Sequence, residues 1–477
     1  MGRDVLLLYM SPKNPKYTTQ TNEGAVRYLI KEKEPPDCIL ALCSETVRKK
    51  AVVEMPDGST CTTLEYFRDA LRRVGIPAER LVVIEVPDSM DDEKKQFQAI
   101  SQLLDKIEKE DTLSIDLSGG MRDTAMLLVT AARCMRDLRD VQTRRVIYAE
   151  LRGEEPVAHD RTQLYDLFDF VTAMDAFFST GTAQKLKSYL WSEGEKDPVL
   201  HTLLTRINQF SEDLALCRVQ KLNGDLNQIA QALKETPKKS QNLTDLFFRL
   251  LKDRFSTEFA ELLSSGEKAL PALVSWCAGH GMYQQALTLL CEQMPEYVCQ
   301  HIFVQPTPKG WEYLATQMQN RGKPWVYPLF HFHFCRLTLL QKEYPYTTDL
   351  RLTLSRDDAE GNMLFGVAND AEMHDYLDMA LASDQLVIDP AIRPQLERAA
   401  LLYQRVMQYR NQINHASAND LGLQSERVLP LDTESVEDAL QEIVVYLHEI
   451  RPLKRNVPQG IEAIPVDAAI PAGTPTR

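Results

Sequence analysis

Five short apolar runs alternate with long amphipathic segments over the first 150 residues, and this alternation constrains the fold more than any other feature of the chain. We predict strands at residues 4–10, 37–44, 80–87, 111–118 and 144–151. Between them lie segments whose apolar residues recur at helical spacing. Short β-branched strands that alternate with amphipathic helices are typical of a parallel α/β sheet of the Rossmann type. Such a sheet binds ligands in the crevice beyond the carboxyl ends of its strands.

From about residue 160 the apolar residues recur at intervals of three and four, which predicts a largely helical remainder. Residues 303–390 are of mixed character, and we interpret them as an elaboration inside the helical part. The Pro- and Ala-rich end predicts a loose tail. The chain is thus expected to contain an α/β domain at 1–155, an all-α domain with linker helices at 156–456 and a tail at 457–477.

Composition indicates a globular protein with an ample core, since 44% of the residues are hydrophobic and 26% are charged. No run approaches the roughly 18 uninterrupted apolar residues of a membrane span. The start, MGRDVLLLYMSP, lacks the pattern of a secretory signal, and it lacks the Ser or Thr of a myristoylation signal. We therefore expect a cytoplasmic protein with no membrane partner.

The net charge of −14 argues against a protein that coats nucleic acid, so we expect no stable DNA binding. A small basic site, or an enzyme that cuts nucleic acid without holding it tightly, is compatible with this charge. The nine cysteines form no C-x-x-C pair and are expected to be buried free thiols. His331 and His333 would need further ligands to hold a metal, and we expect no metal site.

A glycine pair follows the fourth predicted strand, in the stretch SIDLSGGMRDTAM at residues 114–126. We expect the strand to end at Asp116 and a helix to start near Met121. Consecutive backbone N–H groups at such a turn form an anion cradle, which the positive end of the helix reinforces. Arg122 could add a charge-assisted contact to phosphate, whereas Ser118 could simply cap the helix. The loop is neither a Walker A loop nor a G-x-G-x-x-G motif.

Polar residues also follow the first two predicted strands: Ser11 and Asn14 after the first, and Ser44 after the second. In a doubly wound sheet the carboxyl ends of these strands share one edge with the glycine loop. All three side chains are therefore expected to face the same crevice.

The stretch YRNQINHA, residues 409–416, ends a long predicted helix. Arg410 continues a stripe of apolar residues at three- and four-residue steps, namely Leu396, Ala399, Tyr403 and Val406. Asn414 shares the face of Arg410, and Asn411 and His415 form a second such pair. Arg410 and His415 are separated by about 140° on an ideal helix. They would converge only if the helix frays after residue 411 or if two copies share the site across a twofold axis.

An arginine, a histidine and amides without a carboxylate cluster suit the transesterification of RNA, in which the ribose 2′-OH is the nucleophile. Histidine can move protons near neutral pH, and arginine can stabilise the phosphorane-like charge. A polar helix end explains the same residues, because cations in the last turn meet the negative end of the helix dipole. Residue types alone leave both interpretations open.

Three stretches carry a resemblance to a known family. The R-N-x-x-N-H pattern at 410–415 resembles the R-x-x-x-x-H signature of HEPN ribonucleases. DLSGGMR at 116–122 resembles the D-[IL]-[ST]-x-G-x-[RK] loop of CARF sensor domains, and FDFVTAMDAFFSTGTAQKL at 168–186 resembles the linker helix between the two. In this order, they resemble the CRISPR-associated CARF–HEPN ribonucleases of type III antiviral systems.

The resemblance implies a homodimer whose paired Rossmann-like CARF domains bind a cyclic oligoadenylate. Binding would allosterically activate paired HEPN domains, which cut single-stranded RNA without a metal ion or another cofactor. By position, Arg410 and His415 would be the catalytic pair, with Asn411 and Asn414 as auxiliaries. The nucleotide-binding residues would be Ser118, Gly119, Gly120, Met121 and Arg122, with Ser11, Asn14 and Ser44 as further contacts.

Two other functions remain open from the sequence. The chain could be a non-catalytic nucleotide sensor whose helical half binds a partner, with the R-N-x-x-N-H stretch stabilising a dimer. It could also be a toxin-like HEPN ribonuclease held in check by a partner protein, with a purely structural Rossmann-like half. RNA cleavage with and without a cyclic oligoadenylate separates the three functions.

Overall fold

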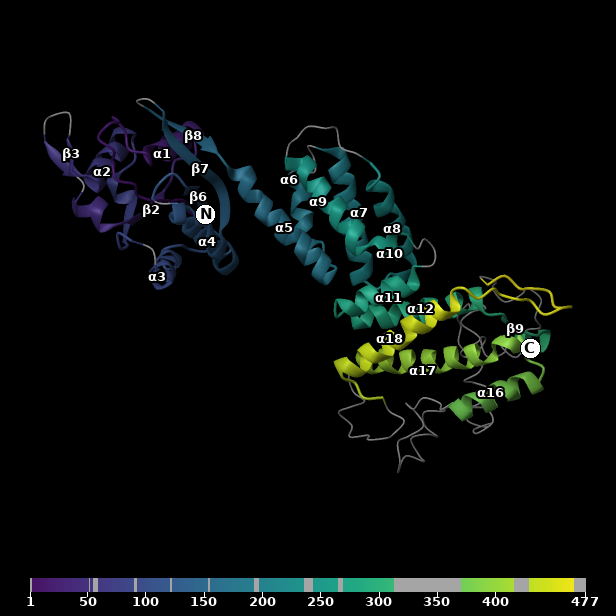
Figure 1. Cartoon of the computed structure of the whole chain (residues 1–477). Coiled ribbons are helices and arrows are strands. Elements are labelled where there is room, and N and C mark those ends of the chain that lie inside the picture. The colour runs from purple at the N-terminus through teal and green to yellow at the C-terminus, as the bar shows by residue number, and fades with distance from the viewer. Residues whose placement is uncertain are drawn as a thin grey trace. The chain divides into compact units, whose positions relative to one another are not determined.

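The computed structural model describes residues 2–50, 52–54, 59–89, 92–120, 122–152, 155–192, 197–235, 243–264, 269–312, 370–415 and 429–466. The chain divides into two compact units, Met1–Asp169 and Phe170–Arg477, and the division falls inside helix α5 (Thr162–Thr180) (Figure 1). Several sequence predictions lie outside the described residues: those for Met121, His331, His333, Cys335, most of 303–390 and the last part of the tail.

Six strands form the sheet of the first unit, in the order β5-β2-β1-β6-β7-β8. Their bounds are Asp4–Tyr9 (β1), Cys38–Cys43 (β2), Leu81–Glu85 (β5), Thr112–Asp116 (β6), Gln142–Arg152 (β7) and Glu155–Asp160 (β8). The first five strands in this order are mutually parallel. The winding reverses between β1 and β6, so the topological switch point of this doubly wound sheet lies beyond the ends of these two strands.

The five strands predicted from the sequence are all present, but the sheet is not purely parallel. β8, which was not predicted from the sequence, runs antiparallel to β7 at the edge of the sheet. The small hairpin of β3 (Val52–Glu54) and β4 (Thr60–Thr62) was not predicted either. β8 reads EPVAHD and has no buried residue, so it lacks the apolar run by which a central strand is recognised. Edge position, which the sequence does not encode locally, explains the omission.

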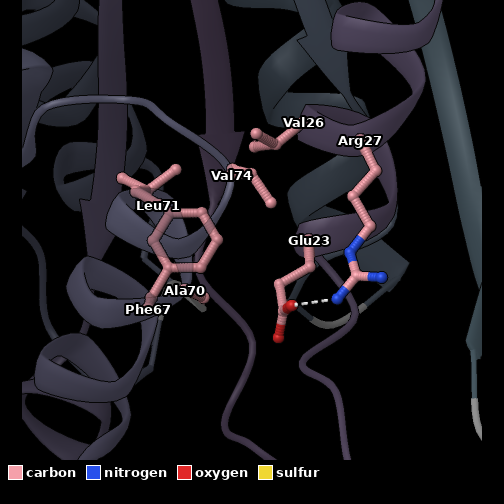
Figure 2. Close-up of a pocket in the computed structure, with 7 residues that line it drawn as sticks. All are labelled: Glu23, Val26, Arg27, Phe67, Ala70, Leu71 and Val74. Carbon is pink, nitrogen blue, oxygen red and sulfur yellow. Dashed lines mark hydrogen bonds and ion pairs between the residues drawn. The ribbon is translucent and has the colours of Figure 1, made fainter.

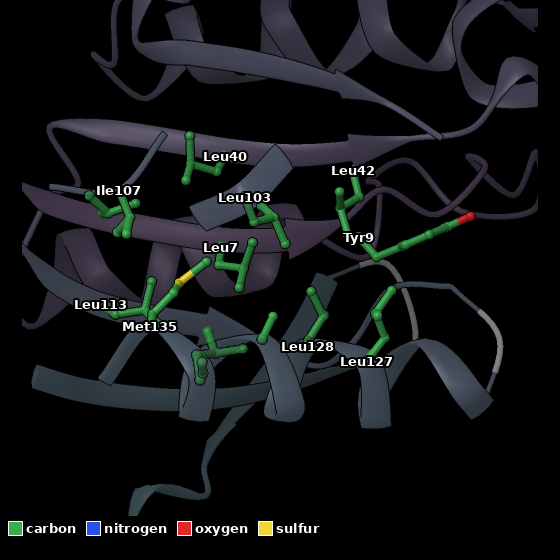
Figure 3. Close-up of a cluster of buried hydrophobic side chains, with 14 of the residues drawn as sticks. Leu7, Tyr9, Leu40, Leu42, Leu103, Ile107, Leu113, Leu127, Leu128 and Met135 are labelled. Atoms are coloured by element: carbon green, nitrogen blue, oxygen red, sulfur yellow. The ribbon is translucent and has the colours of Figure 1, made fainter. Parts of the chain in front are cut away.

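Two layers of helices enclose the sheet. Alternate residues of the central strands face opposite sides, so that Leu7 and Leu40 belong to one core cluster while Leu6 and Ile39 belong to the other. The first cluster is completed by α3 (Glu93–Leu104) and α4 (Arg122–Arg139), and Figure 3 shows its side chains between α4 and the strands. The second is completed by α1 (Glu23–Lys31) and α2 (Thr63–Arg73). Both faces of the central strands are therefore buried, as the continuous apolar runs indicate.

The second unit is built mainly of helices. They are α6 (Gln184–Ser192), α7 (Pro198–Ala215), α8 (Val219–Ala232), α9 (Leu243–Glu258), α10 (Ala260–Ser264), α11 (Leu270–Gly279), α12 (Tyr283–His301), α16 (Asp370–Ala382), α17 (Arg393–His415) and α18 (Thr433–Ile450). An aromatic cluster joins α5, α7, α9 and α11 through Phe177, Phe178, Phe210, Phe255 and Trp276, with ring centroids 5.0–6.5 Å apart. Such ring pairs add stability beyond the apolar area that they bury.

Three tyrosine hydroxyls tie α12, α17 and α18 together. Tyr403 donates to the carbonyl of Cys291 at 2.9 Å, Tyr446 to that of Gln395 at 2.8 Å, and Tyr297 to that of Leu447 at 3.3 Å. Each buried hydroxyl thus finds an acceptor on a neighbouring helix, which avoids the cost of an unpaired polar group. This bundle carries the YRNQINHA stretch.

A short antiparallel pair, β9 (Val304–Pro306) and β10 (Leu386–Ile388), lies in the second unit. It brings together the two ends of the predicted elaboration at 303–390. These two strands were not predicted from the sequence, because three residues are too few to show a period of two. Of the chain between the two strands, residues 313–369 lie outside the described part, whereas α16 is described.

Eight cysteines lie within the described residues, and all are free thiols. Cys38 and Cys43 are buried in strands, as expected, whereas Cys134 on α4 is only half-buried. Among the described helices, none is both long and apolar enough to cross a membrane.

Candidate ligand-binding and catalytic sites

The glycine loop lies at the switch point of the sheet, directly after β6. A Cβ on Gly119 would lie 1.7 Å from the carbonyl oxygen of Tyr9 at the end of β1, so only glycine permits this close approach of two backbones. Gly120 has a φ of +81°, and a Cβ there would lie 2.2 Å from Thr124 Oγ1. Both glycines are therefore required by geometry, which agrees with the tight turn predicted from the sequence.

The carboxylate of Asp116 holds this loop in place through hydrogen bonds. It is completely buried, and it accepts hydrogen bonds from Asn22 Nδ2 at 2.6 Å and from the backbone N–H of Ser118 at 2.9 Å. The Ser118 hydroxyl donates to the same carboxylate. Burial raises the pKa of Asp116 to about 6, while the bonds from Ser118 and Asn22 oppose this rise. The carboxylate thus ties the end of β6 to the start of α1.

Ser118 has a role that was not predicted from the sequence. Its hydroxyl oxygen accepts a hydrogen bond from the backbone N–H of Ala149 on β7 at 2.6 Å, in addition to donating to Asp116. Thr124 Oγ1, one turn into α4, donates to the carbonyl of Gly119 at 3.1 Å. Among the described residues Ser118 makes no capping bond to α4, and its hydroxyl hydrogen is already donated to Asp116. It joins β6 to β7 and positions the loop.

Ser11 is the predicted contact that does reach the glycine loop. Its hydroxyl oxygen accepts a hydrogen bond from the backbone N–H of Gly120 at 3.0 Å. Its own N–H donates to Asn22 Oδ1 at 3.0 Å. Two N–H groups of the predicted anion cradle, those of Ser118 and Gly120, are thus used within the protein. Of the two glycines, Gly119 is buried against the end of β1 and Gly120 is exposed.

The other predicted contacts lie elsewhere at this edge. Asn14 is exposed and forms a local turn, in which its side-chain oxygen accepts from the N–H of Lys16 at 3.0 Å. Ser44 is buried at the end of β2 and contributes to holding the pKa of Asp88 well below its usual range; the backbone N–H of Thr46 is the largest cause of this shift. The backbone of Arg122 opens α4, as predicted, while its side chain and Met121 lie outside the described part of the chain.

Two residues of this site were missed from the sequence, Gln20 and Asn22. Gln20 Nε2 donates to Asn22 Oδ1 at 2.6 Å and to the carbonyl of Ser11 at 2.8 Å. Glu23 receives the N–H of Gln20 at 2.8 Å, and Figure 2 shows its carboxylate paired with Arg27 beside the apolar hollow between α1 and α2. The available signal was the polar run TQTNE at the start of the first predicted helix, which is also an ordinary capping pattern.

The second candidate site lies on α17, which remains helical through His415. The helix therefore does not fray after residue 411, which was one of the two ways in which Arg410 and His415 could converge. The stripe from Leu396 to Val406 is buried, as predicted, and Arg410 at its end is half-buried. On a regular helix the Cβ atoms of Arg410 and His415 diverge by about 140°. The structure describes only the backbone of His415, so its side chain is not placed.

Arg410 is held only weakly. Its Nη1 donates to Asn411 Oδ1 at 3.3 Å, while its Nε is buried without a hydrogen-bond partner among the described residues. A buried donor that stays unsatisfied costs about 1–3 kcal/mol. The positive charge of Arg410 also partly offsets the rise to about 12 that burial causes in the pKa of Cys291.

The two asparagines also differ in exposure. Asn411 is half-buried beside Arg410, whereas Asn414 is exposed and accepts a hydrogen bond from Gln284 Nε2 of α12 at 3.3 Å. Gln412, between them in sequence, is buried and donates to the carbonyl of Leu429 at 3.1 Å, ahead of α18. The polar end of α17 is thus braced by α12 on one side and by the approach to α18 on the other.

No protein-family model matches the chain, and a search of curated proteins finds no match either. Within the described residues, no group of three or more His, Cys, Asp or Glu side chains is arranged to hold a metal ion.

Proposed function

We propose that the chain is a ligand-activated endoribonuclease of the CARF–HEPN kind, which cuts single-stranded RNA in type III CRISPR defence when a cyclic oligoadenylate binds the first unit. The observation that carries the proposal is the glycine loop at the switch point of a doubly wound sheet, the position at which such sheets bind nucleotides. The polar end of α17 supplies the second half of the proposal, because it carries the four residues of the R-N-x-x-N-H pattern.

On the ligand side, the phosphates of the cyclic oligoadenylate approach the loop at Gly119 and Gly120 and the hydroxyl of Ser11. The positive end of α4 favours the negative charge there. The buried network of Asp116 and Asn22 holds the loop in place before the ligand arrives. Such preorganisation lowers the entropic cost of binding.

On the catalytic side, the ribose 2′-OH attacks the adjacent phosphorus and displaces the 5′-oxygen of the next nucleotide. His415 exchanges protons with the attacking and leaving oxygens, and Arg410 stabilises the charge on the phosphorane. Asn411 lies within hydrogen-bond distance of Arg410 and orients it. The products are a 2′,3′-cyclic phosphate and a 5′-hydroxyl, and the reaction requires no metal ion. We propose that a homodimer pairs two such helix ends, because on a straight α17 the two catalytic side chains diverge.

The test is cleavage of labelled RNA with each cyclic oligoadenylate in turn and EDTA present. The intact protein is expected to cut only with its activator, and His415→Ala is expected to lose about 10²- to 10⁴-fold in rate, the range for a general acid–base group. His448→Ala is the matched control, because His448 is a half-exposed histidine on α18 whose ion pair to Glu261 spans 3.9 Å. Full ligand-stimulated activity in His415→Ala would rule out the assignment.

The ligand side is tested with Gly119→Ala, which forces a Cβ into the Tyr9 carbonyl and is expected to abolish activation. Gly75→Ala is its control in the same unit. A Cβ there meets nothing within 4 Å, but the φ of +83° strains any side chain, so this variant reports the effect of backbone strain away from the loop. RNA cleavage without any nucleotide would favour the toxin-like alternative. Ligand binding that leaves RNA intact would favour the non-catalytic sensor.

A further inference from the structure

A cavity of about 580 Å³ lies where the end of α12 meets the turn that follows α18. This volume falls within the range of about 300–1,000 Å³ that is usual for ligand sites. Arg451, Lys454 and Arg455 line it from the turn, and Gln300 and His301 line it from α12. No carboxylate lines it among the described residues.

The positive charge at this cavity exceeds the amount that would balance the negative ends of the two helices. The ends of α12 and α18 each carry about half an elementary negative charge, and cations near them are normally stabilising. Three full positive charges from Arg451, Lys454 and Arg455 leave a clear excess after both helix ends are balanced. In a chain of net charge −14, this concentration of cations around one cavity indicates an anionic ligand.

The three cations are held differently. Arg455 is fixed, because its Nη2 donates to the carbonyl of Ile464 at 3.0 Å and its guanidinium lies over the ring of Phe303 at 5.3 Å. Arg451 and Lys454 are exposed at the rim. The cavity thus combines a rigid guanidinium with two longer-reaching side chains that can follow a phosphate chain.

We propose that this cavity binds the phosphodiester backbone of the single-stranded RNA substrate, which rests on the proposed ribonuclease function. The two aromatic rings beside it, Tyr297 and Phe303, are buried and offer no platform on which a base could stack. Recognition here is therefore through phosphate and independent of sequence. The cavity supplies the local basic site that an overall acidic ribonuclease needs to retain its substrate.

The test uses the full-length protein with Arg451→Gln and Lys454→Gln combined, which removes the two rim charges and keeps Arg455. Binding of labelled poly(U) and poly(A) is measured over a salt series in a His415→Ala background, so that no strand is cut. KM for RNA cleavage is measured in the otherwise native protein. The matched control is Lys185→Gln with Lys187→Gln, which removes the same charge from exposed positions on α6.

The rim variant is expected to bind both homopolymers roughly tenfold more weakly at 0.1 M salt, with KM raised in parallel. The slope of log K against log salt should fall by about 1.4, or about 0.7 for each lost phosphate contact on a single strand. The control variant should keep the native affinity for both homopolymers and the native salt slope. Thermal unfolding of each variant verifies that the bundle is intact.

If RNA binding weakened equally in the rim variant and the control, net charge alone would explain the effect, and the proposal would be overturned. An unchanged slope in the rim variant would overturn it as well, while activator-dependent cleavage by the native protein would leave the ribonuclease function standing. If the native protein cut no RNA but bound it through this cavity, the ribonuclease function would fail and the cavity would stand. Absence of any RNA binding would overturn both.

Discussion

Asp116 is a buried acid whose neighbours are all donors. It accepts bonds from Asn22 and Ser118, and within the described part of the chain no cation contributes to the shift of its pKa. A lone carboxylate in this setting is costly when charged, and donors directed at it recover only part of that cost. At the switch point this carboxylate positions the glycine loop.

The pKa of Asp116 gives a prediction with a definite sign. Burial raises it to about 6, above the value of about 4 in an unfolded chain. Its contribution to stability is therefore complete below about pH 4 and is lost as the pH rises through about 6, which amounts to about 3 kcal/mol for two pKa units. Asp116→Asn should remove this loss.

The measurement is hydrogen exchange of the β1 and β6 amides between pH 4 and pH 7, after correction for intrinsic exchange. Protection in the native protein is expected to fall relative to Asp116→Asn as the pH rises. The fluorescence of tryptophan is unsuitable here, because all four tryptophans, at 191, 276, 311 and 325, lie beyond the first unit. An equal pH dependence in both proteins would show that the carboxylate is not destabilised by burial.

Two glycines in the second unit, Gly224 and Gly181, have opposite effects on stability. Gly224 lies within α8, where a Cβ would meet nothing within 4 Å. Gly181, just after α5, has a φ of +69°, and a Cβ there would lie 3.0 Å from a methyl group of Leu214. The first glycine weakens its helix through backbone entropy, whereas the second is required by its conformation.

Gly224→Ala should therefore stabilise the second unit by about 0.5–1 kcal/mol, the usual difference between glycine and alanine in a helix. Gly181→Ala is expected to destabilise it by about 1 kcal/mol or more, because the left-handed conformation disfavours a side chain. Urea unfolding followed by tryptophan fluorescence measures both. Destabilisation by Gly224→Ala would mean that α8 is packed more tightly than the structure indicates.

The straight course of α17 limits how its two proposed catalytic residues can meet. Its helix continues to His415, so the catalytic side chains proposed for it cannot converge on one copy by fraying. Two copies related by a twofold axis can bring an arginine of one to a histidine of the other. The bundle of α12, α17 and α18 is the rigid support that such an arrangement needs.

A composite site across a dimer predicts complementation between inactive variants. Arg410→Ala and His415→Ala, each inactive alone, are unfolded, mixed and refolded so that subunits exchange. Half of the dimers then carry both variants, and one of their two sites retains a native arginine and a native histidine. About a quarter of native activity should return if each site takes one residue from each copy.

The readout is activator-dependent RNA cleavage by the mixture, with each variant refolded alone as the control. Native protein taken through the same procedure sets the reference rate. No recovery in the mixture, with full recovery in the native reference, would contradict a site that shares one residue from each copy.

The doubly wound unit, the helical remainder and the glycine loop were all predictable from local pattern. Apolar runs spaced by amphipathic helices specify parallel strands, and a glycine pair after a strand specifies a tight turn. These signals are short-range, because they arise from the period of side chains along one element. The stripe that leads to Arg410 is of the same kind, and the structure buries it as predicted.

Tertiary structure alone decided which polar residues meet. The bond between Asp116 and Asn22 joins residues 94 positions apart, and the bond between Gln284 and Asn414 joins residues 130 positions apart. Neither has a local signature, because it depends on which strands and helices become neighbours. The same holds for β8, an edge strand, and for the cavity that joins Arg451 to His301. Sequence patterns determined most of the described elements, apart from β8 and the short hairpins, and packing determined the sites, because chemistry requires groups that only long-range contacts bring together.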